Sequence, residues 1–226
     1  MKTVVLISAN AEWRSIKRLL PNYEVESSPL GECFSLEVTG RPVVYFHGGW
    51  GKISAAATAQ YVIDRFQPDL LVNLGTCGGF EGRVETGTII LVDRTIVYDI
   101  IEQMTDPDEA IADYSTRIDL EWLSQPYPAP VSRGLLVSGD RDIVVGDIPM
   151  LVNRFGANAA DWESGAIAWV ANKNRVRLLI LRGVTDLVGS AGGEAYGNFE
   201  LFERRTDQVM GQLTEQLGAW IVAAGG

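Results

Sequence analysis

The chain alternates short, continuous apolar runs with segments of helical periodicity. Runs rich in Val, Ile and Leu cover residues 3–8, 69–75, 87–93, 134–140 and 177–186. A strand with one solvent-exposed face alternates polar and apolar residues, whereas these runs are apolar throughout. They therefore predict strands that are buried on both faces, in a sheet covered by helices. Helical spacing is found over residues 11–20, 52–66 and 200–223. The alternation therefore predicts an α/β fold.

Size and charge narrow the class of protein further. With 226 residues, 46% of them hydrophobic, the chain is long enough for one large core, and we expect a single domain over residues 1–226. The formal net charge of -10, without a Lys/Arg cluster, argues against a nucleic-acid partner. The opening run "MKTVVLIS" is too short for a membrane span, so we expect a strand there, no membrane partner and a cytoplasmic location.

Cysteine and histidine are scarce. Two cysteines, Cys33 and Cys77, are too few for a disulfide framework, which fits a reducing compartment. The single histidine, His47, has no paired Cys/His spacing around it of the kind that binds zinc. We therefore expect neither a metal nor a cofactor.

The acidic, proline-bearing segment 102–132 interrupts the alternation. We expect it to leave the sheet and to serve as a lid, a dimer contact or both. Trp50, Trp122 and Trp169 are candidate apolar side chains for a dimer surface.

Charged residues and glycines follow several of the predicted strands, where open α/β sheets bind their ligands. Glu12 follows the first strand, "GGWGK" precedes the helix at 52, and Thr76 lies in "NLGTCGG". Arg182 and Asp186 stand in "RGVTD", after the most apolar run. Each has a simpler explanation on its own, namely a helix start for Glu12, tight turns for the glycines and an Arg182–Asp186 ion pair.

The stretch "AADWESGAIAWVA", residues 159–171, places Asp161 and Glu163 beside apolar sequence. Asp161 can cap the helix that begins near Glu163, and Glu163 can then be a partner of the helix dipole in the first turn. A buried glutamate is costly unless it is paired. Three carboxylates, one arginine and two glycine turns at one sheet edge together predict a hydrolytic site for a polar, sugar-bearing ligand.

With these pieces in this order, the sequence resembles the nucleoside phosphorylase superfamily, and within it the 5'-methylthioadenosine/S-adenosylhomocysteine nucleosidase family. The matching pieces are Glu12, "GGWGKISAA", "NLGTCGGF" followed by "GTIILVD", "VSGD", "DWESGAIA" and "RGVTD". The resemblance implies a three-layer αβα fold with a central mixed, twisted sheet, and a homodimer. It also implies hydrolysis of an N-glycosidic bond of a purine nucleoside in methionine salvage.

The resemblance also assigns roles to residues. Asp186 corresponds to the acid that assists the departing purine through N7, and Glu12 to the base that orients the attacking water. Glu163 corresponds to the carboxylate that binds the ribose hydroxyls. Thr76 and Arg182 are expected to line the water's side of the sugar.

Trp162 is an expected substrate contact at a position where the family usually has methionine. Phe199 is expected to close over the 5' group. The remaining expected contacts are Cys77, Gly78 and Ile143. Cys77 is expected as a small filler rather than a nucleophile, because no histidine is placed to activate it. Asp142 stands where the family has an aromatic residue that stacks on adenine, so the accepted base is left open.

The chemistry agrees with this assignment. Cleavage of an N-glycoside develops positive charge on the sugar, which carboxylates stabilise, and it needs an acid for the base and a base for the water. Glu12 would repel phosphate, which favours water as the nucleophile. Arg14 follows closely and arginine binds phosphate, so phosphorylase activity remains an alternative. A hydrolase of another purine nucleoside, such as futalosine, and a nucleoside-binding protein without activity also remain alternatives.

Overall fold

The computed structural model describes residues 1–20 and 22–225. Its strands are β1 (Thr3–Ile7), β2 (Glu26–Ser28), β3 (Gly31–Val38), β4 (Arg41–His47), β5 (Leu70–Phe80), β6 (Ile89–Val97), β7 (Ser115–Arg117), β8 (Ser132–Ser138), β9 (Ala159–Asp161), β10 (Arg177–Gly189) and β11 (Gly192–Gly193). Its α-helices are α1 (Asn10–Leu19), α2 (Gly51–Phe66), α3 (Pro107–Asp113), α4 (Ser164–Asn174) and α5 (Phe199–Ala223).

The strands form one mixed sheet that curls back on itself. β4, β1, β5 and β10 are parallel neighbours, and β2 and β3 continue the sheet antiparallel beyond β4. On the other side, β10 pairs with β6, β6 with β8, β8 with β9, and β9 with β5. The five strands β5, β10, β6, β8 and β9 thus close a ring, which the pattern of apolar runs does not predict.

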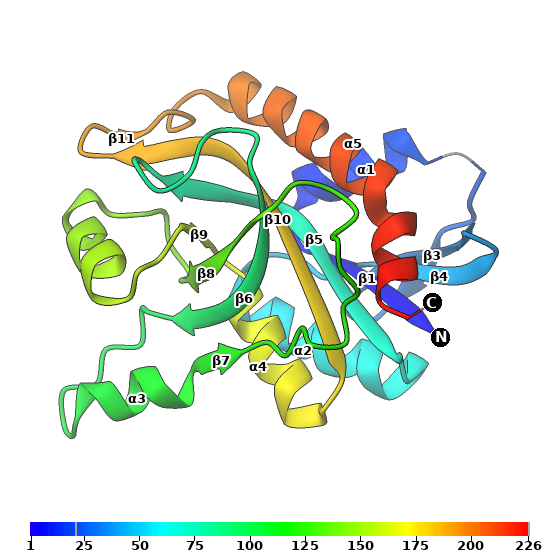
Figure 1. Cartoon of the computed structure of the whole chain (residues 1–226), viewed down its shortest axis with the longest axis horizontal. Helices are drawn as coiled ribbons and strands as arrows, with labels where there is room; N and C mark the ends of the chain where they lie inside the picture. The colour runs from blue at the N-terminus through cyan, green and yellow to red at the C-terminus, as the bar shows by residue number, and fades with distance from the viewer. Residues whose placement is uncertain (21, 226) are drawn as a thin grey trace.

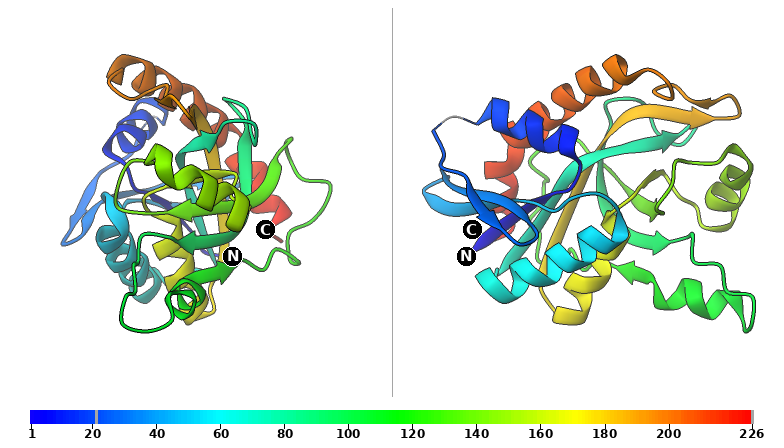
Figure 2. Two further views of the ribbon diagram at one scale, coloured as in Figure 1. Left: turned by 90° about the vertical axis from the view of Figure 1, so that its left-hand side faces the viewer. Right: turned by 180° about the vertical axis from the view of Figure 1, so that it is seen from behind.

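Helices cover both faces of the sheet, in agreement with the predicted three-layer α/β architecture (Figure 1). α1 and α5 pack against each other on one side, and α2 and α4 pack against each other on the opposite side (Figure 2). Every residue of β1 is buried, as expected for a strand with a helix layer on each face. The continuous apolar runs are therefore explained by burial on both faces.

Most of the predicted elements differ from the observed ones by a few residues at their ends. The largest difference is in β5, which runs on through "TCGG" to Phe80. The prediction of a glycine turn in this stretch is wrong. A side chain at Gly79 would meet Val84 and Val184 at 2.6 and 2.7 Å, so glycine there permits close packing beside the strand.

The expectation that segment 102–132 leaves the sheet is wrong in part. Its middle forms β7, which pairs with β6, and the chain after β7 packs Leu120 and Leu123 into the core. The Ser124 N–H donates to the carbonyl of Ala223, which ties the segment to the end of α5. This segment therefore connects β6 of the ring to the end of α5.

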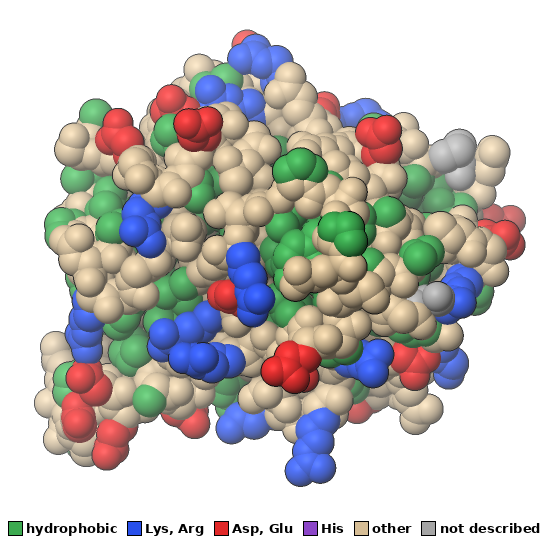
Figure 3. Space-filling model, in the orientation of Figure 1, with side chains coloured by type: hydrophobic (Ala, Val, Ile, Leu, Met, Phe, Trp, Pro, Cys, Tyr) green, Lys and Arg blue, Asp and Glu red, His purple; other side chains and the backbone are tan. Residues whose placement is uncertain are grey.

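On the face shown in Figure 3, acidic and basic side chains are interspersed, and hydrophobic side chains gather near the centre. Cys33 and Cys77 are both buried and unpaired. Within residues 1–20 and 22–225, none of the helices has the length and apolar character needed to cross a bilayer.

Candidate active site

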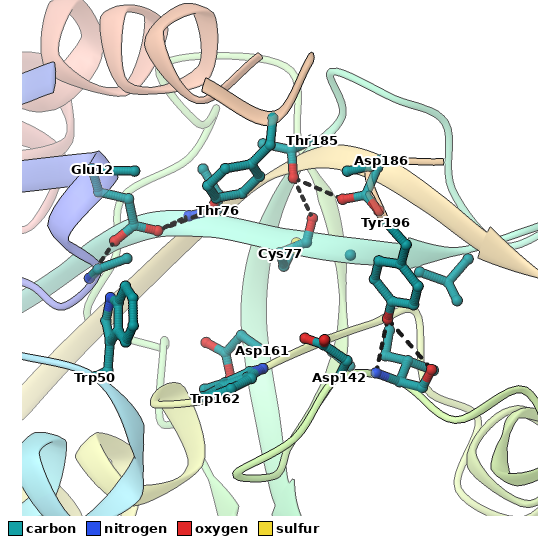
Figure 4. A pocket seen from close by; sticks show the side chains of 18 of the residues that line it. Glu12, Trp50, Thr76, Cys77, Asp142, Asp161, Trp162, Thr185, Asp186 and Tyr196 are labelled. Atoms are coloured by element: carbon teal, nitrogen blue, oxygen red, sulfur yellow. Dashed lines mark hydrogen bonds between the residues drawn. The ribbon is translucent and has the colours of Figure 1, made fainter. Parts of the chain in front are cut away.

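One large cavity, of about 660 Å³, opens at the carboxyl ends of β1, β5 and β10. The starts of α1 and α5, Trp50 before α2, and the loops around Asp142 and Trp162 complete its wall (Figure 4). The structure brings together here all but one of the expected site residues: Glu12, Thr76, Cys77, Gly78, Ile143, Trp162, Glu163, Asp186 and Phe199. The exception is Arg182.

Glu12 is buried in the first turn of α1, and its carboxylate is held by several donors. The backbone N–H and the hydroxyl of Thr76 donate to Oε1 at 2.6 and 2.9 Å. The backbone N–H of Ala9 donates to Oε2 at 3.1 Å (Figure 4). This oxygen keeps lone-pair capacity for a further partner. The helix N-terminus adds a favourable field for the negative charge.

Glycine at position 75 allows this arrangement. A side chain at Gly75 would lie 1.9 Å from Nη1 of Arg182 and 2.7 Å from Oε1 of Glu12. β5 therefore passes between the two charged groups only because it carries no side chain at this position.

Arg182 lies beneath the cavity rather than in its wall, so the expectation that it lines the sugar is wrong. Its guanidinium is fully buried, 3.0 Å from the Asp161 carboxylate and 3.6 Å from Glu12. It also donates to Ser164 Oγ at 2.9 Å and to Asn73 Oδ1 at 2.8 Å. The alternative Arg182–Asp186 pair is wrong as well. Arg182 instead balances the charges of two carboxylates from below.

Asp186 reaches the cavity because of an irregularity in β10. The register with β5 shifts between Val184 and Asp186, and such a bulge re-aims the following side chain. The Thr185 hydroxyl donates to Asp186 Oδ1 at 3.0 Å (Figure 4). Burial raises the pKa of Asp186 above its ordinary value, against the opposing effects of Thr185 and the Ala195 N–H. A carboxyl with a raised pKa is suited to donate a proton.

Glu163 is buried between the starts of two helices. It is the residue before α4, and its Oε1 accepts a hydrogen bond of 3.0 Å from the Gly51 N–H, the first residue of α2. Burial raises the pKa of Glu163, the neighbouring charge of Asp161 raises it further, and Arg182 opposes both. Asp161 accepts from the Ser164 N–H, the first residue of α4, at 3.1 Å. The N-cap position itself is held by Glu163, so Asp161 is not the N-cap residue that the sequence predicts. Glu163, whose burial is costly unless it is paired, therefore faces the cavity and accepts one hydrogen bond from the backbone.

Two aromatic residues of the wall were not expected there. Trp50, a candidate for the dimer surface, lines the cavity and is 59% exposed. Its place in "GGWGK", between a strand and a helix, was the signal for it. Trp122 and Trp169 are half-buried and lie elsewhere, with Arg177 and Lys173 over their rings. Tyr196 also lines the cavity, and no sequence pattern pointed to it.

Tyr196 and Asp142 shape the side of the cavity near Ile143. The Ile143 N–H donates to the Tyr196 hydroxyl at 2.9 Å, and that hydroxyl lies 3.4 Å from the Ile143 carbonyl oxygen (Figure 4). The Asp142 carboxylate also lines the cavity. Burial raises the pKa of the Cys77 thiol, which keeps it neutral and agrees with a filler role. In the described part of the chain, no three His, Cys, Asp or Glu side chains cluster as metal ligands would.

The family model described as the phosphorylase superfamily matches residues 3–218. The chain belongs to the phosphorylase superfamily. Among curated superfamily members, it is 25% identical over 230 residues to the 5'-methylthioadenosine/S-adenosylhomocysteine nucleosidase of Tolumonas auensis, covering 96% of this chain and 100% of that one. It is 27% identical to the nucleosidase of the same name from Listeria welshimeri, covering 88% of this chain and 91% of that one.

Solved superfamily structures have the same fold. The nucleosidase of Streptococcus pneumoniae, solved with the transition-state inhibitor MT-ImmA, gives a TM-score of 0.76 at 21% identity over 99% of both chains. The Neisseria meningitidis enzyme in complex with methylthio-immucillin-A also gives a TM-score of 0.76 at 21% identity, over 97% of this chain and 100% of that one. The predicted nucleoside phosphorylase-like fold is thereby confirmed.

Proposed function

We propose that this protein hydrolyses the N-glycosidic bond of a purine nucleoside, with 5'-methylthioadenosine and S-adenosylhomocysteine as the first candidate substrates. The observation that carries the proposal is the placement of Glu12, Glu163 and Asp186 around one cavity at the carboxyl edge of the sheet. The names of the curated relatives support the same class of substrate.

Asp186 is the proposed acid. A purine leaves slowly as an anion, so protonation of the base lowers the barrier to its departure. The raised pKa of Asp186 supports this role, because it enlarges the protonated fraction at neutral pH. The bulge at Thr185 places the carboxyl in the cavity wall, where a bound base can reach it.

Glu12 is the proposed base that orients and activates the attacking water. Its Oε1 accepts from two donors of Thr76, while Oε2 accepts from the Ala9 N–H and keeps capacity for a further donor. A carboxylate anchored in this way has one oxygen ready to accept a proton from water without reorienting. Arg182 is the proposed positioning residue, which holds the Glu12 carboxylate in place from beneath the cavity.

Glu163 is the proposed ribose ligand. The sugar acquires positive charge as the bond breaks, and a nearby carboxylate stabilises that charge. Ribose hydroxyls would donate to Glu163 and favour its ionised form, against the effect of burial, which raises its pKa. The remaining proposed substrate contacts are the other lining residues Thr76, Cys77, Gly78, Ile143, Trp162 and Phe199.

Phosphorolysis is the second candidate, because Arg14 lines the cavity and arginine is a common phosphate ligand. Arg14 is, however, paired with Glu203 at 3.0 Å, and the buried Glu12 would repel phosphate. These two charges favour water as the nucleophile.

The deciding experiment is the release of free purine from methylthioadenosine, adenosylhomocysteine, adenosine, inosine and futalosine, each with and without phosphate. We expect adenine release from the two thio-nucleosides at a rate independent of phosphate. Release that requires phosphate would make the protein a phosphorylase. Release only from inosine or futalosine would move the substrate to another purine nucleoside, and no release at all would leave a binding protein.

We also propose a homodimer and a cytoplasmic location. Exposed apolar side chains lie at the start of α2 and after β6, including Ile53, which is 85% exposed, and Met104, which is 93% exposed. These two regions are adjacent, since Lys52 forms an ion pair with Asp99. Exposed side chains of this kind are typical of a surface that a second subunit covers.

A further inference from the structure

The segment between β11 and α5 carries a tyrosine into the cavity. Tyr196 follows Gly193 and precedes Gly197, whose φ of 76° is in the left-handed region that favours glycine. The ring lines the cavity opposite Asp142 (Figure 4). Tyr196 is 45% exposed, so its ring is not locked in place by burial.

The Tyr196 hydroxyl uses both backbone polar groups of Ile143. It accepts from the Ile143 N–H at 2.9 Å and lies 3.4 Å from the carbonyl oxygen, to which it donates. A phenolic hydroxyl is both a donor and an acceptor, and a nucleobase edge with a neighbouring donor and acceptor offers the same pair. A base therefore cannot bond to this edge of the cavity while Tyr196 occupies it.

The segment around Tyr196 keeps its own support when this side chain turns away. The Tyr196 N–H donates to the Gly193 carbonyl at 3.1 Å, and the Asn198 N–H donates to the Ala195 carbonyl at 2.9 Å. Glu194 is paired with Arg205 of α5 at 2.8 Å. None of these contacts involves the hydroxyl, so moving the half-exposed ring away costs the two bonds to Ile143 and the packing of the ring over Gly193.

We propose that Tyr196 is a gate that determines specificity: it occupies the Ile143 edge in the free protein, and a nucleobase must displace it by supplying both the donor and the acceptor. The nature of the ligand rests on the proposed function, but the competition itself does not require hydrolysis. When the Ile143 edge is free in only a fraction of the protein molecules, the apparent affinity is the intrinsic affinity multiplied by that fraction. The gate therefore lowers the affinity of every ligand that binds at this edge. The affinity falls most for ligands that cannot replace both hydrogen bonds of the Tyr196 hydroxyl to Ile143.

The test is Tyr196→Phe, which keeps the ring and removes the hydroxyl. We expect the Kd of adenine, measured by calorimetry, and the KM of the hydrolysed nucleoside to fall by about 2- to 10-fold, the effect of removing the competing hydroxyl. We expect kcat to change less than KM. The matched control is Tyr114→Phe, since the Tyr114 ring stacks on Trp169 and is not among the residues that line the cavity; its Kd should equal that of the unmodified protein.

Several results would overturn the gate. Weaker adenine binding by Tyr196→Phe would mean that the hydroxyl binds the ligand instead of competing with it. An unchanged Kd, or no adenine binding by either protein, would also reject it. Failure of the proposed function gives a different result, namely no hydrolysis of any nucleoside. In that case the adenine affinities of the unmodified protein and of Tyr196→Phe can still be compared, so the gate is tested separately.

Discussion

Asp186 is the residue on which the proposed chemistry depends most. It is one of four buried carboxylates that line the cavity, and its environment raises its pKa mainly through burial. We expect Asp186→Asn to lower kcat by roughly 10²–10⁴-fold while KM changes little, because proton donation acts in the transition state. Steady-state kinetics with the nucleoside that the unmodified protein hydrolyses measures both constants.

The matched control for this variant is Asp119→Asn, which makes the same chemical change at a site outside the cavity. It should leave kcat and KM as they are. A nearly normal kcat for Asp186→Asn would remove this residue from the role of acid, whatever else it contributes.

Thr185 tunes Asp186 and gives a prediction on pH. Its hydroxyl donates to the carboxylate and lowers the pKa of Asp186, so Thr185→Val should raise that pKa further. The acid acts only when protonated, and activity is lost as the pH rises through its pKa. The variant should therefore keep its kcat to higher pH than the unmodified protein. A pH profile of kcat in which the alkaline limb stays in place or moves to lower pH would contradict this.

At the scale of elements, β5 is the strand around which the site is built. It places Thr76 against Glu12, and its neighbour β10 carries both Arg182 and Asp186. The absence of a side chain at Gly75 lets the charges of α1 and β10 meet across the strand. The glycines of "NLGTCGG" thus serve close approach within a strand rather than a turn.

We expect Gly75→Ala to destabilise the protein by about 3–5 kcal/mol, since the added methyl group separates a buried arginine from its carboxylate. Urea unfolding monitored by circular dichroism measures the free energy of unfolding. Gly211→Ala in α5 is the matched control: its Cβ meets nothing within 4 Å outside its own helix, and we expect a gain of about 0.5–1 kcal/mol. Equal stability of the two variants would reject the proposed importance of the gap at Gly75.

For the whole molecule, the distribution of exposed apolar side chains leads to a prediction on assembly. Ile53→Asp places a charge in the proposed dimer surface on α2, and we expect the dimer to dissociate into monomers. Light scattering coupled to size-exclusion chromatography measures the mass. Val222→Asp, at the far end of α5, makes a similar change at another exposed site and should leave the dimer intact. A monomeric unmodified protein would reject the proposed homodimer outright.

At the same scale, we propose that residues 1–226 form one domain. The ring of β5, β10, β6, β8 and β9 joins strands that lie far apart in the sequence, from β5, which begins at Leu70, to β10, which ends at Gly189. Strands so distant in sequence are expected to unfold together, so a single calorimetric transition should be seen for the unmodified protein.

The sequence by itself determined the buried strands, the helices and the edge of the sheet at which the site forms. These features depend on the local spacing of apolar and polar residues, which folding does not change. It also indicated the carboxylates Glu12, Glu163 and Asp186 of the cavity, because functional groups recur where strands end.

The tertiary structure alone decided which charged groups meet and how the sheet closes. Arg182 was expected at the sugar but is paired with Asp161 and Glu12, and it also bonds to Asn73, 109 residues away in the sequence. The bond of Tyr196 to Ile143 spans 53 residues and leaves no periodic signal. Contacts of this range are selected by packing and charge balance of the whole chain, so local patterns do not contain them.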